Sequence, residues 1–231
     1  MYIEFENLKK YGFLGIQTTR KAGNMKEKEN LYPLLDKLNI DKNNLVKGVQ
    51  THSINILCLE ENTDISNIEN IDGYITDNPK YTLMAYFADC MPIFIIDKKK
   101  KVYGLLHGGW RGSSNGILKE AINIMKSKYG SNVNDIIVTF GICISSKNYE
   151  IKEDVIKELK LRLNFDTMIE SAANKFYLSL SKMNEQIAIN QGVPRKNIIV
   201  NDYCTYAGDF FSYRKEKTDK RMIALLKVGI E

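Results

Sequence analysis

At residues 81–112 the chain has the sequence YTLMAYFADCMPIFIIDKKKKVYGLLHGGWRG. Extended apolar runs at Tyr81–Ala88, Pro92–Asp97 and Val102–His107 are separated by short polar breaks, which is typical of neighbouring strands in a sheet. The basic run Lys98–Lys101 lies between two of these strands, so it predicts a solvated hairpin tip rather than a nucleic-acid patch. This stretch therefore predicts that a β-sheet forms the centre of the fold.

The rest of the chain predicts further strands and helices around this sheet. The other expected strands are two short ones at Ile3–Phe5 and Phe13–Gln17, followed by Lys47–His52, Ile54–Leu59, Ile136–Phe140, Ile198–Val200 and Met222–Val228. Helices are expected over Leu31–Leu38, from Asn115 after the capping residues Ser113 and Ser114, around Val155–Leu163, and over Lys175–Asn190, which Gly192 ends. With no repeat and no long linker in the sequence, we expect one α+β domain over residues 1–231, with mixed sheets flanked by helices.

The composition excludes several function classes. The 231 residues include 33 Lys and Arg against 28 Asp and Glu, a balance too mixed to indicate nucleic acid as a partner. The two histidines, His52 and His107, are too few for a multi-copper cluster or a His-rich proton relay. The N-terminal stretch is acidic where a secretory signal would be apolar, and the four cysteines form no Cys-x-x-Cys pair. We therefore expect a cytoplasmic protein with reduced thiols and no membrane contact.

Both histidines and one cysteine lie at predicted strand ends. His52 ends the run Lys47–His52, Cys90 stands between two strands beside Pro92, and His107 ends the next strand. Two imidazoles and one thiolate form a borderline-soft donor set that suits zinc, and three protein ligands leave the open position of a catalytic site. His52, Cys90 and His107 are thus the predicted metal ligands, with Cu²⁺ as the alternative to Zn²⁺.

The loop His107–Gly112 predicts an anion site beside this metal. Its adjacent glycines let the backbone approach a ligand closely, and the following helix offers unpaired N–H groups at its N-terminus. Arg111 supplies a planar fork of donors that suits phosphate. Arg111 is therefore a candidate substrate-binding residue.

Three further residues are candidates for contact with substrate. Gln50 would share one face of the predicted strand Lys47–His52 with His52, because side chains alternate along a strand. Phe211 and Arg214 lie in an aromatic and cationic stretch that suits a planar base, although the same pattern is typical of a strand entering the core.

Two carboxylates have open roles. Asp89 is the candidate proton carrier. In an alternative, Cys90 is the nucleophile of a Cys-His hydrolase, His107 is its base, and Asp89 orients His107. Asp89 would need an irregular turn to lie beside Cys90 for this role. Asp72, before Gly73, is either a catalytic acid or part of a turn, and the pattern slightly favours the turn.

Several motifs together resemble the polyphenol oxidase or laccase-domain family. They are Val49–His52, Asp72–Thr76, Ala88–Pro92, His107–Gly112 with Asn115–Ile117, Tyr149–Ile151 and Phe211–Arg214. The sequence departs from the family pattern at Ile142, Ser179 and Lys220. The resemblance implies zinc held by His52, Cys90 and His107, and a fold similar to the catalytic domain of a cytotoxic necrotizing factor.

Members of this family are regarded as purine nucleoside phosphorylases with adenosine deaminase activity. The resemblance thus implies a zinc-dependent enzyme acting on adenosine, inosine and, as a further candidate, methylthioadenosine, with phosphate as co-substrate. Together with Asp89, the candidate proton carrier, Cys90 and His107 are the expected catalytic residues. A mononuclear copper oxidoreductase remains the alternative, because Met91 would complete a blue-copper ligand set. We expect a monomer or homodimer.

Overall fold

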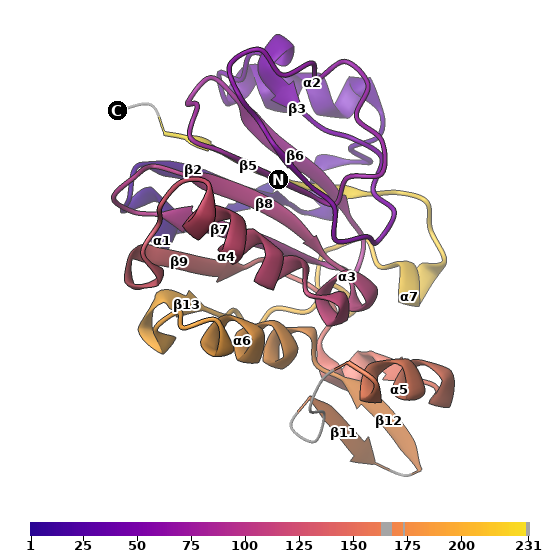
Figure 1. Cartoon of the computed structure of the whole chain (residues 1–231). Coiled ribbons are helices and arrows are strands. Elements are labelled where there is room, and N and C mark those ends of the chain that lie inside the picture. The colour runs from indigo at the N-terminus through magenta and orange to yellow at the C-terminus, as the bar shows by residue number, and fades with distance from the viewer. Residues whose placement is uncertain (163–167, 173, 230–231) are drawn as a thin grey trace.

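Two large β-sheets lie face to face, and helices cover their outer faces (Figure 1). The structure is a computed structural model, and it describes residues 1–162, 168–172 and 174–229. The first sheet contains, in spatial order, Tyr2–Glu4 (β1), Phe13–Thr18 (β2), Met222–Val228 (β14), Thr82–Phe87 (β6) and Leu45–Val46 (β3). The second contains Ile198–Ile199 (β13), Ile136–Phe140 (β9), Met91–Asp97 (β7), Tyr103–Gly108 (β8), Gly73–Thr76 (β5) and Ile56–Cys58 (β4).

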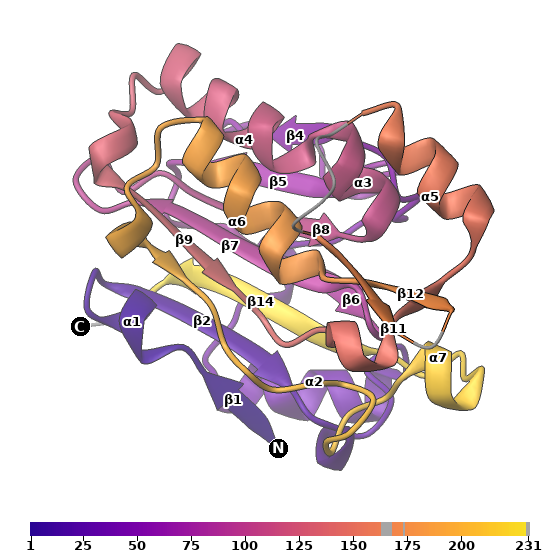
Figure 2. The ribbon, with the colours of Figure 1, turned by 90° about the horizontal axis from the view of Figure 1, so that it is seen from below.

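The described residues contain seven helices. They are Glu6–Lys9 (α1), Lys28–Lys37 (α2), Trp110–Asn115 (α3), Ile117–Ser127 (α4), Glu153–Lys160 (α5), Leu180–Asn190 (α6) and Tyr213–Glu216 (α7). Of these, α2, α4 and α6 pack on the outer faces of the two sheets. Helix α2 covers the first sheet, and α4 and α6 lie side by side over the second (Figure 2). A small third sheet joins Glu150–Ile151 (β10), Lys175–Leu178 (β12) and Ile169–Ala172 (β11). Within the described ranges, no helix has the length and apolar composition that a bilayer crossing requires.

Strand β7 shows why the sequence forms these layers. Its side chains alternate between the two faces of the sheet. Ile93 and Ile95 belong to the buried cluster under α4 and α6, whereas Phe94 and Ile96 belong to the cluster between the sheets. A strand buried on both faces is continuously apolar rather than alternating, which is the pattern of this stretch.

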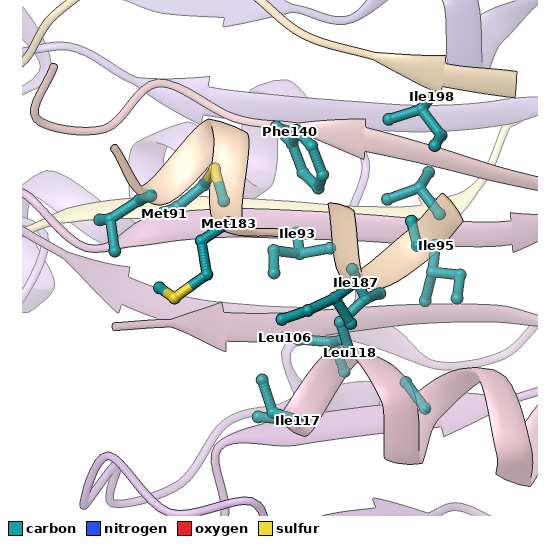
Figure 3. Close-up of a cluster of buried hydrophobic side chains, with 14 of the residues drawn as sticks. Met91, Ile93, Ile95, Leu106, Ile117, Leu118, Phe140, Met183, Ile187 and Ile198 are labelled. Atoms are coloured by element: carbon teal, nitrogen blue, oxygen red, sulfur yellow. The ribbon is translucent and has the colours of Figure 1, made fainter. Parts of the chain in front are cut away.

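The cluster under α4 and α6 is shown in Figure 3. Ile93 lies in it with Leu118 of α4 and with Met183 and Ile187 of α6. Met91, at the start of β7, is fully buried in the same cluster. Each such side chain contributes about 1.5–3 kcal/mol when it is removed from water, so this layer holds the ends of β7 and β8 in place.

The central strands confirm the prediction from residues 81–112. The three apolar runs form β6, β7 and β8, and β7 pairs antiparallel with β8 from Met91↔Gly108 to Ile96↔Tyr103. The lysine run forms the turn between β7 and β8, where Asp97 accepts backbone N–H groups of Lys99 and Lys100. The mixed α+β class is likewise confirmed.

The prediction of a strand over Lys47–His52 is wrong. Val49 forms only an isolated bridge, and His52 has a left-handed backbone with φ 62°. The reason lies in Asp72, whose carboxylate accepts the backbone N–H groups of residues 51–53. These donors are therefore not available for a β-ladder, and the neighbouring run Ile54–Leu59 shortens to β4.

The helix predicted over Lys175–Asn190 is confirmed only from Leu180 onward. Its first turn is strand β12, which pairs with β10 and β11. Ser179 then caps α6, because its hydroxyl accepts the backbone N–H of Lys182 at 3.2 Å. Gly192 follows the end of α6 with φ 89°, as expected for a residue that stops a helix.

The helix after the glycine loop begins earlier than predicted. Ser113 and Ser114 lie inside α3, which begins at Trp110 with Gly109 as its N-cap. Gly116, at φ 96°, separates this short helix from α4. The helix predicted around Val155–Leu163 is α5, and Leu163 lies outside the described residues.

Candidate metal centre and substrate cavity

Three segments that are distant in sequence bring His52, Cys90 and His107 together. His107 lies on β8, Cys90 ends the turn between β6 and β7, and His52 lies in the loop before β4. Their potential ligand atoms all lie within 4.8 Å of one another, and the Cys90 sulfur is 3.7 Å from His52 Nε2. The structure thus places the three predicted ligands in one cluster.

Asp72 holds two of the three residues in position. The Nδ1–H of His107 donates to its Oδ1 at 2.7 Å, and the backbone N–H of His52 donates to the same oxygen at 3.0 Å. The other carboxylate oxygen accepts from the backbone and side chain of Ser53, both at 2.8 Å. Burial raises the pKa of Asp72, but the hydrogen bonds from His107 and Ser53 outweigh it and leave the pKa well below its usual range.

Cys90 and His107 stabilise each other's charged form. Burial raises the pKa of the Cys90 thiol, but the charges of His107 and His52 and the hydrogen bonds with both rings together outweigh it, so the net direction is down. Burial lowers the pKa of His107, yet the charge of Cys90 and the hydrogen bond to Asp72 raise it above its usual value. A thiolate, the form that binds metal, is therefore favoured at this position.

Gly109 leaves the space in which these side chains meet. A Cβ atom at this position would lie 2.8 Å from His52 Cδ2 and 3.2 Å from the Cys90 sulfur. Only glycine lets the backbone after β8 approach the cluster this closely. The backbone angles of Gly109, φ −72° and ψ 163°, are accessible to any residue, so the requirement is for space.

The cluster fits a single metal ion of the zinc type. Two imidazoles and one thiolate are zinc donors, and a carboxylate on the second nitrogen of a ligating histidine is the usual support for such a site. His107 and Asp72 have this arrangement. Met91 packs in the hydrophobic cluster, so it does not supply the axial ligand of a blue-copper site.

The cluster opens into a cavity of about 800 Å³. Besides the three ligand residues and Asp89, its lining contains cations and aromatic rings; these are Lys26, Arg111, Arg214, Lys217 and Arg221, and Tyr86, Trp110, Tyr149 and Tyr213. Ligand sites of this size hold small organic molecules, and the excess of cations favours an anionic group on the bound molecule.

Arg111 and Arg214 present their guanidinium groups beside aromatic rings. Arg111 stacks over Trp110 at 4.3 Å and forms no ion pair within the described residues. Arg214 stacks over Tyr149 at 4.9 Å and donates to the carbonyl of Glu150 at 2.6 Å. Since α3 has only six residues, its dipole is small, and Arg111 is the stronger candidate for binding an anion.

Gln50 and Asp89 line the same cavity, but their side chains also hold the backbone. The Gln50 amide donates to the Tyr86 carbonyl and accepts its N–H, at 3.0 and 2.7 Å. Asp89 has φ 91°, so the chain makes an irregular turn here, but the Asp89 carboxylate is not part of the cluster of His52, Cys90 and His107. Its carboxylate accepts from the Thr205 hydroxyl at 2.7 Å and from the backbone N–H of Arg214 at 2.6 Å.

Phe211 does not line the cavity. Its ring is buried with Phe210, Ile142 and Met222, and the Arg20 guanidinium lies 4.6 Å above it. The aromatic pattern around residue 211 therefore belongs to the core, which was the other interpretation of the sequence. Arg214, three residues later, reaches the cavity because α7 begins between them.

The sequence leaves the role of one contributor to the site open and misses another. Asp72 is more than the turn residue that the pattern slightly favours, since its carboxylate binds His107 and the loop of His52. The Asp-Gly pair directly before β5 marks Asp72 in the sequence. Its hydrogen bond to a histidine 35 residues away depends on the fold and cannot be read from a local pattern. Tyr149 lines the cavity although the sequence assigned it no contact with substrate.

The fold and this cluster define a protein of two packed sheets with a His-Cys-His site in a cationic cavity. Residues 9–228 match the family described as multi-copper polyphenol oxidoreductase laccase, and the chain belongs to this family. The cluster found in the described residues offers ligands for one ion rather than several.

Relatives and solved structures extend the likeness over most of the chain. Purine nucleoside phosphorylase SSP1584 of Staphylococcus saprophyticus is 30% identical over 190 residues, covering 77% of this chain and 71% of its own. A purine nucleoside phosphorylase of Borreliella burgdorferi is 31% identical over 207 residues, 85% of both chains. The hypothetical protein YfiH of Bacillus licheniformis has a TM-score of 0.90 at 24% identity, covering 98% of this chain and 96% of its own. YlmD of Geobacillus stearothermophilus has a TM-score of 0.88 at 25% identity, covering 95% of this chain and 93% of its own.

Proposed function

We propose that this protein is a zinc-dependent purine nucleoside phosphorylase that also deaminates adenosine. The relatives named purine nucleoside phosphorylase support the first activity. The observation that carries the proposal is the His52–Cys90–His107 cluster, which opens into a cavity lined by five cations and several aromatic rings. Such a cavity suits a purine nucleoside together with a phosphate ion.

His52, Cys90 and His107 would hold the zinc ion, and Asp72 would orient His107 toward it. A bound zinc ion supplies a Lewis acid and lowers the pKa of water. The borderline-soft donors and the burial of Met91 in the core favour zinc over a blue-copper centre.

Phosphorolysis joins phosphate to the sugar C1′ as the purine leaves. We assign the phosphate to Arg111, whose guanidinium faces the cavity with no ion pair in the described part of the chain. Arg214 lies on the same cavity and is a second candidate for this anion. Two guanidinium groups hold a dianion in the orientation that an attacking oxygen needs.

The purine is assigned to the aromatic part of the cavity. Trp110 and Tyr149 both line it, and each ring has a guanidinium stacked on it. Planar bases stack on such rings. Asp89 is the proposed proton carrier, because deamination requires a group that takes a proton from the water attacking C6 of adenine.

The proposal is tested by following products from a zinc-loaded sample of measured metal content. The protein is incubated with adenosine, inosine or methylthioadenosine, with and without phosphate, and free base, ribose 1-phosphate and inosine are separated by chromatography. We expect base release that requires phosphate, and inosine from adenosine without phosphate. A folded, zinc-loaded sample that forms none of these products contradicts the proposal, and Cys90→Ala shows whether a contaminant forms them.

One feature of the geometry also supports a second candidate function, a hydrolase with Cys90 as nucleophile. His107 lies beside Cys90, and its other nitrogen is bound by Asp72, which takes the orienting role that the sequence gave to Asp89. The two candidates differ in their need for metal. A hydrolase of this kind is active without metal and is inhibited by zinc, whereas the phosphorylase requires zinc.

A further inference from the structure

Two cysteines outside the metal centre face each other across a backbone bridge. Cys143 and Cys204 are the partners of an isolated parallel β-bridge, and the N–H of Thr205 donates to the carbonyl of Cys143 at 3.0 Å. Bridge partners lie about 4.8 Å apart, which is within the Cα–Cα range of about 4.4–6.8 Å that a disulfide spans. Both side chains pack in the cluster under α4 and α6.

The two thiols have different surroundings. The Cys204 sulfur is half-buried and accepts the backbone N–H of Ser145 at 3.2 Å and the Asn148 amide at 3.5 Å. Burial raises the pKa of Cys204, but hydrogen bonds from Ser145 and from the backbone of Ala207 and Tyr206 outweigh it and lower the pKa below its usual value. Cys143 is buried, and burial raises its pKa to about 12. Cys204 is therefore the thiol that reacts first with an oxidant, and Cys143 is placed to react second.

The pair is connected to the metal centre through Asp89. The residue after Cys143, Ile144, donates its N–H to the Asp89 carbonyl at 3.0 Å. The residue after Cys204, Thr205, donates its hydroxyl to the Asp89 carboxylate at 2.7 Å. Both strands of the bridge thus hold Asp89, which directly precedes the ligand Cys90 in a left-handed turn.

We propose that Cys143 and Cys204 are a redox pair that a hydroperoxide oxidises to a disulfide, and that closing this disulfide loosens the metal centre at Cys90. The Cys204 thiolate attacks one peroxide oxygen, the O–O bond breaks, and a sulfenic acid forms as the other oxygen leaves and takes up a proton from water, giving an alcohol or, from hydrogen peroxide, water. The Cys143 sulfur then attacks the sulfenic sulfur, and the S–S bond forms as the hydroxyl leaves with the Cys143 proton as water. The two thiols lose two electrons in all, and these reduce the O–O bond of the hydroperoxide.

The effect on the metal centre follows from the geometry of a disulfide. Closing it requires the two Cβ atoms to approach to about 3.8 Å, which is closer than aligned bridge partners lie. Ile144 and Thr205 move with their neighbours, so the two hydrogen bonds that hold Asp89 are strained. This part of the inference rests on the metal centre proposed above, whereas the disulfide does not.

The test treats zinc-loaded protein with a small excess of hydrogen peroxide and then maps its disulfides. Trypsin separates the four cysteines, since Cys58, Cys90, Cys143 and Cys204 fall in residues 48–80, 81–98, 129–147 and 197–214. We expect peptides 129–147 and 197–214 to become linked, with the loss of two of the four free thiols. Either Cys143→Ser or Cys204→Ser should abolish the link, whereas Cys58→Ser should not change it.

Two readouts then test the connection to Cys90. Zinc affinity, measured by competition with a chelator, should fall about tenfold on oxidation, because a metal ligand whose hydrogen-bonded surroundings are disturbed binds more weakly. Reduction of the disulfide with a dithiol should restore the affinity. Hydrogen exchange around Asp89 should become faster, and this readout does not depend on metal. Linkage through Cys90, absence of any link, or a link that leaves both readouts unchanged would overturn the proposal.

Discussion

The carboxylate of Asp72 accepts the Nδ1–H of His107 at 2.7 Å and the backbone N–H of His52 at 3.0 Å through one oxygen atom. One side chain thereby fixes the ring orientation of one proposed ligand and the backbone of another. One of these residues lies on a strand and the other in an irregular loop, so the shared acceptor fixes their position relative to each other.

Asp72→Asn should weaken zinc binding by about 10- to 100-fold, because His107 loses its carboxylate partner. The measurement is chelator competition on the purified variant. Asp97→Asn is the matched control, since Asp97 is also a buried carboxylate that accepts backbone N–H groups, but it holds the turn after β7. If both variants bind zinc as the parent does, Asp72 does not support the metal centre.

Gly109→Ala should damage the site without destabilising the fold. The new Cβ would lie 2.8 Å from His52 Cδ2, while the backbone angles suit alanine. Displacement of a catalytic group by about 1 Å costs about 100-fold in rate, so kcat/KM for inosine should fall by about this factor with Tm unchanged. Wild-type kinetics in this variant would show that the space beside His52 is not needed.

Metal binding should release protons in a pH-dependent number. At neutral pH the raised pKa of His107 keeps its ring protonated, and the lowered pKa of Cys90 keeps its thiol ionised. Zinc must then displace about one proton from these two groups. The number of protons released from them rises toward two as the pH falls and Cys90 becomes protonated. It falls toward zero as the pH rises through the pKa of His107. Calorimetry in buffers of different ionisation enthalpy measures this number, and a value independent of pH would be the contrary result.

Arg111→Ala should raise KM for phosphate by about 10- to 100-fold, because the variant loses the hydrogen bonds from the guanidinium to the phosphate. A hydrogen bond to a charged group contributes about 1.5–3 kcal/mol, which corresponds to this factor. KM for inosine should change little. Lys119→Ala on the exposed side of α4 removes a cation that does not line the cavity and serves as the control. An unchanged phosphate KM would assign the anion to another residue, with Arg214 the next to test.

The sequence predicted the central strands because each is a long apolar run, and it selected the three candidate ligands that the fold brings together because few residues carry the required chemistry. It failed where a distant side chain decides the conformation. The loop of His52 departs from a strand because Asp72 takes its backbone donors. Phe211 is buried under Arg20, a contact across most of the chain that no local pattern contains.

The metal centre itself is tested most directly by X-ray absorption at the zinc edge of the loaded protein. We predict one zinc per chain with one sulfur at about 2.3 Å and two imidazole nitrogens at about 2.0–2.1 Å, with the sulfur lost in Cys90→Ser. A zinc environment without sulfur, or with oxygen ligands alone, would contradict the assignment of His52, Cys90 and His107.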